Sequence, residues 1–128
     1  MRFRGFASVF AVADVGAALD FYVRRMGFGV EFRMGDPPEY AIVERDHVQL
    51  HLMPAARAPE SRGRSAIYVY TAGVDALHAE LVGRGCPIEM PPEDFSYGMR
   101  EASVRDPDGN RLTFGEEIVK PEAAPSPA

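Results

Sequence analysis

The stretch from Tyr97 to Glu117 restricts the fold most, because it has the pattern of a β-hairpin with one apolar and one polar face. Its centre, residues 106–110, reads DPDGN and combines residue types that form tight turns, since proline fixes φ and glycine accepts positive φ. Side chains of a strand alternate between two faces, which predicts an apolar face made of Ala102, Val104, Leu112 and Phe114. The opposite face carries Glu101, Ser103 and Thr113. The hairpin therefore needs a core on one side and a polar surface or a ligand on the other.

The rest of the chain divides into two similar halves. In the first half the residue pattern predicts a strand at 3–13, a helix from Val15 to Met26 that ends at Gly27, and strands at 28–34, 40–44 and 47–53. A polar linker at 54–64 follows. The second half predicts a strand at 66–71, a helix at 74–82, a strand at 88–90, a loop at Pro91-Pro92 and the closing hairpin.

The two halves align at an offset of 58 residues, with Phe10 over Tyr68 and Gly27 over Gly85. Further along, the offset becomes 62, with His51 over Thr113. The repeated element order indicates a duplicated βαβββ module. We therefore predict an α+β fold in a single domain, residues 1–118, with modules at about 3–54 and 65–118. Residues 119–128 contain too little apolar surface to fold and are predicted to form a disordered tail.

Two such modules predict a ligand cleft. A four-stranded sheet with one helix buries its helix-facing side, so two modules side by side leave a concave face lined by alternate strand residues. The alternation places Gln49 and His51 of the first module on this face. Glu101, Ser103 and Thr113 of the second module fall on the same face.

Charge and cysteine content exclude several classes of function. The chain has 14 Lys and Arg against 19 Asp and Glu, a net charge of −5, and no basic cluster, which argues against nucleic-acid binding. No apolar run approaches the roughly 18 residues of a membrane-spanning helix, so we expect a cytoplasmic protein without membrane contact. The single cysteine, Cys86, cannot form an internal disulfide. The acidic balance favours a neutral or cationic ligand.

Three motifs carry a family resemblance. They are YGMREASVRDPDGNRLTFGEE at 97–117, VADVGAALDFYVRRMGF at 12–28 and VDALHAEL at 74–81. In this order and spacing the chain, from about Arg4 to Glu117, resembles the vicinal oxygen chelate superfamily, and within it the glyoxalase/bleomycin-resistance branch. The resemblance implies two βαβββ modules that form a concave ligand cleft. It also implies a homodimer in which each cleft takes residues from both chains.

The enzymes of this superfamily hold a metal at four positions, usually occupied by His, Gln or Glu. By resemblance these positions are Ala7, His51, Ala66 (or Ser65 by the repeat offset) and Thr113. One imidazole without a second strong donor cannot form a stable divalent site, which needs three or four ligands. We therefore predict no metal and no cofactor.

The resemblance then favours the bleomycin-resistance type, a metal-independent protein that binds and sequesters an antibiotic-like small molecule without changing it. The segment 90–99 resembles the loop that borders the ligand in that type, with Tyr97 where a tryptophan is usual. Two enzymatic alternatives stay open. One is a metal-dependent glyoxalase- or dioxygenase-like lyase or oxidoreductase, in which Glu101 or Glu116 joins His51 as a ligand. The other is a cofactor-free enzyme that uses His51 and Glu101 as acid and base.

The predicted ligand contacts are His51, Glu101, Tyr68, Tyr70, Phe95, Tyr97, Met99, Tyr40 and Thr113. The partner would be a cationic or aromatic small molecule. Several of these residues also have a structural alternative. His51 can be a hydrogen-bonded structural histidine, and Glu101 a cross-strand partner of an arginine. Tyr68 and Tyr70 share one face of a strand, which is either a stacking surface or part of the core. Large side chains at 95–99 suggest a binding rim or a dimer contact more than a core.

Overall fold

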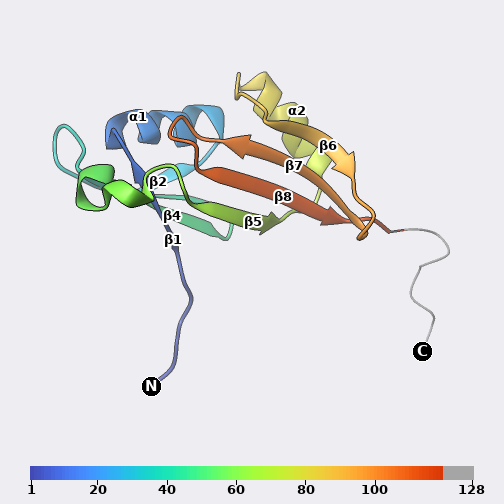
Figure 1. Ribbon diagram of the computed structural model, residues 1–128, viewed down its shortest axis with the longest axis horizontal. Helices are drawn as coiled ribbons and strands as arrows, with labels where there is room; N and C mark the ends of the chain where they lie inside the picture. The colour runs from blue at the N-terminus through green and yellow to red at the C-terminus, as the bar shows by residue number, and fades with distance from the viewer. Residues whose placement is uncertain (120–128) are drawn as a thin grey trace.

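The computed structural model describes residues 1–119 and has two four-stranded sheets with two helices (Figure 1). Sheet A has the order β1-β4-β3-β2, with β1 at Ser8–Val12, β2 at Gly29–Met34, β3 at Tyr40–Arg45 and β4 at Val48–Pro54. Sheet B has the order β5-β8-β7-β6, with β5 at Ala66–Tyr70, β6 at Met90–Asp94, β7 at Met99–Arg105 and β8 at Arg111–Glu117. Helix α1 spans Val15–Asp20 and continues as a π-helical turn at Phe21–Arg25, and α2 spans Val74–Gly83. Short 3-10 turns at Ala55–Arg57 and Pro59–Ser61 connect the halves.

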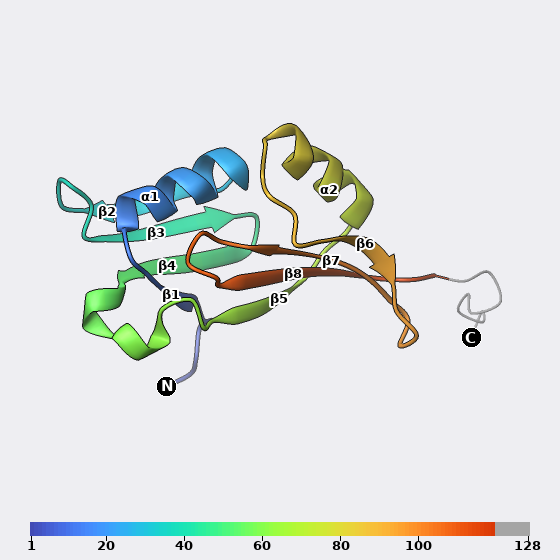
Figure 2. The same cartoon turned by 45° about the horizontal axis from the view of Figure 1, so that its top comes forward.

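This architecture confirms the predicted α+β fold of two βαβββ modules. In each sheet the first strand pairs in parallel with the fourth, and the remaining pairs are antiparallel. Both helices cover the same side of the sheets, which leaves the other side of all eight strands without a helix (Figures 1 and 2). We call this uncovered side the open face.

The core lies between the helices and the sheets and extends through both modules. Its buried apolar residues include Phe10, Val12, Leu19, Tyr22, Val43, Leu50, Leu52, Leu81, Val104, Leu112 and Phe114. Leu19, Tyr22 and Leu81 come from the helical segments, and alternate strand positions supply the others, because strand side chains have a period of two. Asp14 begins α1 by accepting a 3.0 Å hydrogen bond from the Ala17 amide at Oδ1, which satisfies one of the unpaired N–H groups of the first turn.

The turn of the last hairpin joins the two modules. The hydroxyl of Tyr22 donates a 2.9 Å hydrogen bond to Oδ2 of Asp106, and both side chains are buried. Burial, followed by the proximity of Asp106, raises the pKa of the Tyr22 phenol. The amide of Ala13 donates to Oδ1 of Asp108 at 2.9 Å, and Nδ2 of Asn110 donates to the Ala11 carbonyl at 3.3 Å. The motif that the sequence marks as a turn therefore also fixes the first module against the second.

One extra residue in the first module changes the internal alignment. Helices α1 and α2 begin 59 residues apart, at Val15 and Val74, whereas Gly27 and Gly85, with φ of 72° and 74°, are 58 apart. The π-helical turn, with its wider spacing, takes up the additional residue. The predicted offset of 58 is therefore correct at the glycines and wrong by one in the first strands and at the helix starts.

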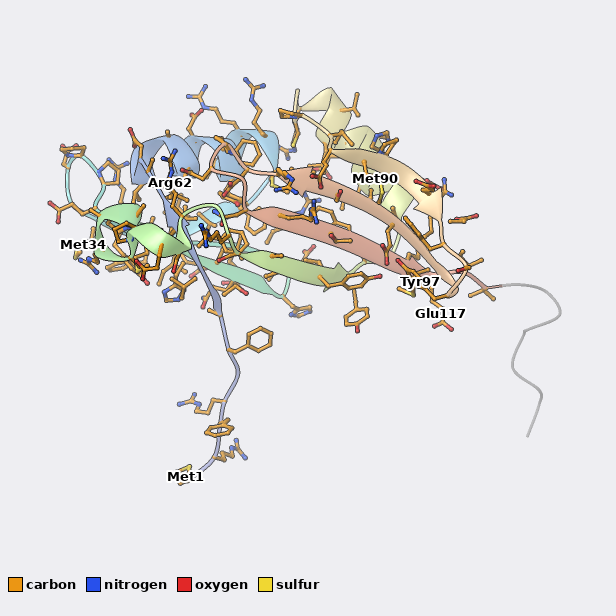
Figure 3. The ribbon with its side chains drawn as sticks, in the orientation of Figure 1. Met1, Met34, Arg62, Met90, Tyr97 and Glu117 are labelled. Carbon is orange, nitrogen blue, oxygen red and sulfur yellow. The ribbon has the colours of Figure 1, made fainter. Side chains whose placement is uncertain are left out.

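Two strand boundaries also differ from the prediction. The first strand begins at Ser8 rather than at residue 3, and residues 1–7 extend away from the sheets (Figure 3). The Phe3 and Phe6 side chains are almost fully exposed. The predicted loop at Pro91-Pro92 instead belongs to β6, which is an edge strand. Edge strands tolerate proline because one side needs no amide donor, and the pairing with β7 is irregular between Met90 and Glu93. The predicted disordered tail lies, apart from Val119, outside the described residues.

Candidate functional site

The strand register defines which side chains share the open face. In sheet A, one row of neighbouring residues across the four strands is Val9, His51, Ile42 and Phe32. In sheet B, the corresponding row is Tyr68, Thr113, Ser103 and Met90. Val9, not Phe10, is thus the counterpart of Tyr68, and Phe10 is fully buried on the helix side. His51 and Thr113 are counterparts, as the offset of 62 predicts.

A pocket of about 360 Å³ lies on the open face of sheet B, within the size range of small-molecule sites. We call it the sheet-B pocket. Its lining residues are Glu89, Met90, Phe95, Glu101, Ser103, Arg111 and Thr113. Three of the predicted ligand contacts, Phe95, Glu101 and Thr113, are therefore brought together here.

Glu101 is the buried carboxylate of this pocket, with 7% of its surface exposed. The hydroxyl of Tyr68 donates a 2.7 Å hydrogen bond to its Oε2. Partial desolvation and this acceptor raise the pKa of the Tyr68 phenol to about 12. The partner of Glu101 is thus a tyrosine, and the cross-strand arginine considered from the sequence is not its partner in the described structure.

Aromatic rings surround the Glu101 end of the pocket. Phe95 and Tyr97 stack, with ring centroids 5.5 Å apart and an interplanar angle of 15°. Tyr68 and Tyr70 form an edge-to-face pair at 5.4 Å. Tyr97 is 63% exposed, and partial desolvation, with Glu101 nearby, raises its pKa. Tyr70 is 84% exposed, so the sequence alternative in which Tyr68 and Tyr70 belong to the core is wrong. Figure 3 shows Tyr97 at the far end of sheet B, near Glu117.

A cationic cluster, which the sequence reasoning missed, forms the other end of the pocket. Oε1 of Glu89 accepts hydrogen bonds from Arg111 Nε at 2.9 Å and from Ser103 Oγ at 2.8 Å. Its Oε2 accepts from Arg111 Nη2 at 3.2 Å and from Arg105 Nε. These donors hold the pKa of Glu89 at about 2. The sequence contained a signal for this cluster. Arg105 comes four residues after Glu101 and Arg111 two residues before Thr113, so strand alternation places both arginines on the face that carries Glu101 and Thr113.

The predicted residues of sheet A form a second, separate group. Nδ1 of His51 and the hydroxyl of Tyr40 lie 2.8 Å apart, and which of them donates depends on the imidazole tautomer. The guanidinium of Arg57 lies over the Tyr40 ring, 5.8 Å from its centroid. No hydrogen bond of the described residues connects this pair with Tyr68 and Glu101.

Met99, the last predicted contact, lies in sheet B. It begins β7 and is half-buried, two residues before Glu101 on the same face. Ligand contact by all these residues stays a prediction.

A larger hollow, of about 540 Å³, lies between the modules on the helix side, beside Phe28, Val48 and Leu77. Its main charged groups are already paired: Glu80 accepts from Arg45 at 2.8 and 2.9 Å and from Arg84 at 2.8 Å, and its pKa is lowered to about 2. We place the candidate site on the open face instead, because there a buried carboxylate and several rings meet at an accessible surface.

The four metal positions that the family resemblance implies do not fit a metal in this chain. Because the two helices begin 59 residues apart, the module alignment pairs Ala7 with Ala66. Ser65, the alternative for the third metal position, is thereby excluded. Neither alanine has a ligating side chain, and Thr113 adds only a hydroxyl to the imidazole of His51. Within residues 1–119, no three His, Cys, Asp or Glu side chains are grouped so that they could hold a metal ion.

The comparison with protein families matches residues 6–114 to the Glyoxalase/Bleomycin resistance protein/Dioxygenase superfamily. The chain belongs to this superfamily. This confirms the family resemblance of the three sequence motifs. A comparison with curated proteins gives no match. In the described part of the chain, no helix has the length and apolar character needed to cross a membrane.

Several solved structures of superfamily proteins resemble this chain over nearly its whole length. The bleomycin-binding protein of Streptomyces verticillus, solved with copper(II)-bleomycin, is 29% identical with a TM-score of 0.72, covering 94% of this chain and 99% of that one. The antibiotic binding protein TnmS3 of Streptomyces sp. CB03234 is 26% identical with a TM-score of 0.73, covering 91% and 99%. A superfamily member from Sphaerobacter thermophilus is 28% identical with a TM-score of 0.71, covering 89% and 98%.

Proposed function

We propose that this superfamily member is a metal-independent binding protein that sequesters an antibiotic-like small molecule without changing it. The observation that carries the proposal is Glu101, a buried carboxylate that faces the sheet-B pocket and is surrounded by tyrosine and phenylalanine rings. Two of the similar proteins are a bleomycin-binding protein and an antibiotic binding protein, which supports the same role here. The unsuitable metal positions support binding over Lewis-acid catalysis.

The pocket chemistry favours a ligand with a cationic group on an aromatic body. A carboxylate with low exposure forms strong, charge-assisted hydrogen bonds to an ammonium or guanidinium group. The rings of Phe95 and Tyr97 offer faces to the same cation and stacking area to the aromatic body. The net charge of −5 attracts a cation over longer distances.

A homodimer is part of the proposal. On the open face of sheet A, Val9 and Phe32 are each 46% exposed and Met34 is 41% exposed. Exposed apolar patches of this kind mark sites of association. A second copy that covers this surface would close the open sheet-B pocket with residues of its own, which deepens a site that one chain leaves shallow.

Isothermal titration of the purified protein with copper(II)-bleomycin and a panel of cationic aromatic antibiotics tests the proposal. We expect one of these ligands to bind, and Glu101→Gln to weaken that binding by about tenfold or more, which corresponds to the loss of about 1.4 kcal/mol. Glu60→Gln, at an exposed turn outside the site, is the matched control and should bind normally. Mass spectrometry should recover the ligand unaltered.

Two outcomes would contradict the proposal. Chemical conversion of the bound ligand would identify an enzyme. One tightly held metal per chain, found by elemental analysis after exposure to Ni²⁺, Zn²⁺, Mn²⁺ and Fe²⁺, would show that ligands other than the four aligned positions form a metal centre. In either case the enzymatic alternatives would replace the binding function.

A further inference from the structure

The end of the sheet-B pocket opposite Glu101 carries an excess of positive charge. Two arginines, Arg105 and Arg111, share the single carboxylate of Glu89, so the cluster has one more positive than negative charge. Glu89 also accepts from Ser103, which gives its two oxygens four donors and leaves little capacity for more.

The arginines, in contrast, retain donors. Nη1 of Arg111 and Nη2 of Arg105 have no hydrogen-bond acceptor among residues 1–119. The Arg111 side chain is 43% exposed and lines the pocket. If Arg111 turns toward a ligand, Arg105 and Ser103 continue to satisfy Glu89, so recruitment of Arg111 does not leave a carboxylate unpaired.

The strand register sets the distance between the two ends. Arg105 and Arg111 pair directly, Ser103 and Thr113 pair next, and Glu101 pairs with Gly115. Glu101 and Arg105 are four residues apart on the same face of β7, which is about 13 Å at the rise of a strand. The hydroxyls of Ser103 and Thr113 form the floor between them, and that of Thr113 has no partner among the described residues.

We propose that the sheet-B pocket selects amphoteric ligands, with the cationic group at Glu101 and a carboxylate or another anionic group at Arg111. The inference rests on the proposed binding function and makes it more specific. In a site for a simple cation, the excess positive charge of Arg105 and Arg111 at the far end would weaken binding, because it repels the ligand. An anionic group at the far end turns this repulsion into a charge-assisted, bidentate contact.

Three probes of one shape test the inference. The first is a biphenyl with an aminomethyl group on one ring and a carboxylate on the other, both para to the ring junction. The second lacks the carboxylate, and the third lacks the amine. Their dissociation constants are measured by titration on the wild-type protein, Arg111→Gln and Glu101→Gln. Arg24→Gln removes an equivalent exposed charge on the helix side and serves as the control.

We expect the wild-type protein to bind the amphoteric probe about tenfold more tightly than the amine, the ratio that one charge-assisted contact supplies. Arg111→Gln should remove this advantage and leave the affinity for the amine unchanged or higher, whereas Arg24→Gln should preserve it. Equal binding of the amphoteric probe and the amine, with loss of both in Glu101→Gln, would overturn the inference and leave the proposed function intact. If none of the three probes binds but a ligand of the antibiotic panel does, the inference is overturned and the proposed function stands; if neither the probes nor the panel bind, both are overturned.

Discussion

The hydroxyl of Tyr68 lies over the Cα of Gly115, so close that a Cβ at residue 115 would be 1.9 Å from the phenol oxygen. Gly115 sits on β8, between the strand that carries Tyr68 and the strand that carries Glu101. The absence of a side chain lets the tyrosine cross β8 and donate its hydrogen bond to Glu101. Gly115 is therefore a positioning residue for the candidate site.

We expect Gly115→Ala to displace Tyr68 and destabilise the fold by about 1–3 kcal/mol, the usual cost of an inserted methyl group in a packed region. Urea unfolding measures this change. The cost should fall markedly in a Tyr68→Ala background, where the obstructing ring is gone. Gly83→Ala is the control, because a Cβ there meets nothing within 4 Å and φ is unstrained.

A second observable follows from the same contact. Displacement of Tyr68 from Glu101 should return its phenol toward a pKa near 10 from the value of about 12 that it has in the intact protein. Ultraviolet titration of the phenols, with Tyr68→Phe as the reference, detects the change. An unchanged titration together with equal costs of Gly115→Ala in both backgrounds would show that residue 115 does not position the tyrosine.

Tyr22 supports a prediction about the contact between modules. Tyr22→Phe deletes one of the four donors around the buried carboxyl of Asp106, the others being the amides of Asp108 and Asn110 and the side chain of Asn110. We expect a loss of about 1.5–3 kcal/mol in the free energy of unfolding, as for hydrogen bonds to charged groups. Tyr70→Phe, at an exposed position, should change it by less than about 0.5 kcal/mol. Equal effects of the two substitutions would contradict the structural role of this hydrogen bond.

The sequence predicts the fold well because its signals are local and repeated. The turn residues at 106–110, the alternation in 101–105 and 111–117, and the helical spacing after Asp14 each act over short distances. The π-helical turn could not be predicted in this way, because an additional residue at 21–25 leaves the helical pattern of apolar residues almost unchanged. The additional residue becomes visible only when the strand registers of the two modules are compared.

The candidate site was less predictable, because its contacts depend on register between strands. Both faces of β5 carry large apolar residues, Ile67 and Val69 on one and Tyr68 and Tyr70 on the other, so alternation alone did not decide which face is buried. The partner of Glu101 lies 33 residues away, and Glu89 meets Arg111 from a segment for which the sequence predicted a short strand and a loop. Such pairings follow from sheet assembly rather than from local pattern.

The lowered pKa of Glu89 predicts how the free energy of unfolding depends on pH. The pKa of its carboxyl is lowered from 4.5 to about 2 by the hydrogen bonds from Arg111 and Arg105. Between these values the unfolded chain binds the proton more readily than the folded chain, so the stabilisation is present above about pH 4.5 and is lost as the pH falls toward 2. Urea unfolding at neutral pH and in this window should show a smaller acid loss for Glu89→Gln than for the wild-type protein. If acid lowers the stability of Glu89→Gln as much as it lowers that of the wild-type protein and of Glu60→Gln, the cluster of Glu89, Arg105 and Arg111 does not contribute to the pH dependence of stability.

The last prediction concerns the open face of sheet A, where the Phe32 side chain is 46% exposed. If a second copy covers this surface, light scattering should give about twice the chain mass of 14.1 kDa. Phe32→Glu places a charge in the interface, and because buried unpaired charges are costly, we expect it to reduce the mass to that of one chain. Val82→Glu makes the same change at an exposed position of α2, on the helix side, and should leave the dimer intact. A wild-type mass of one chain would refute the dimer, and equal effects of both substitutions would place the interface elsewhere.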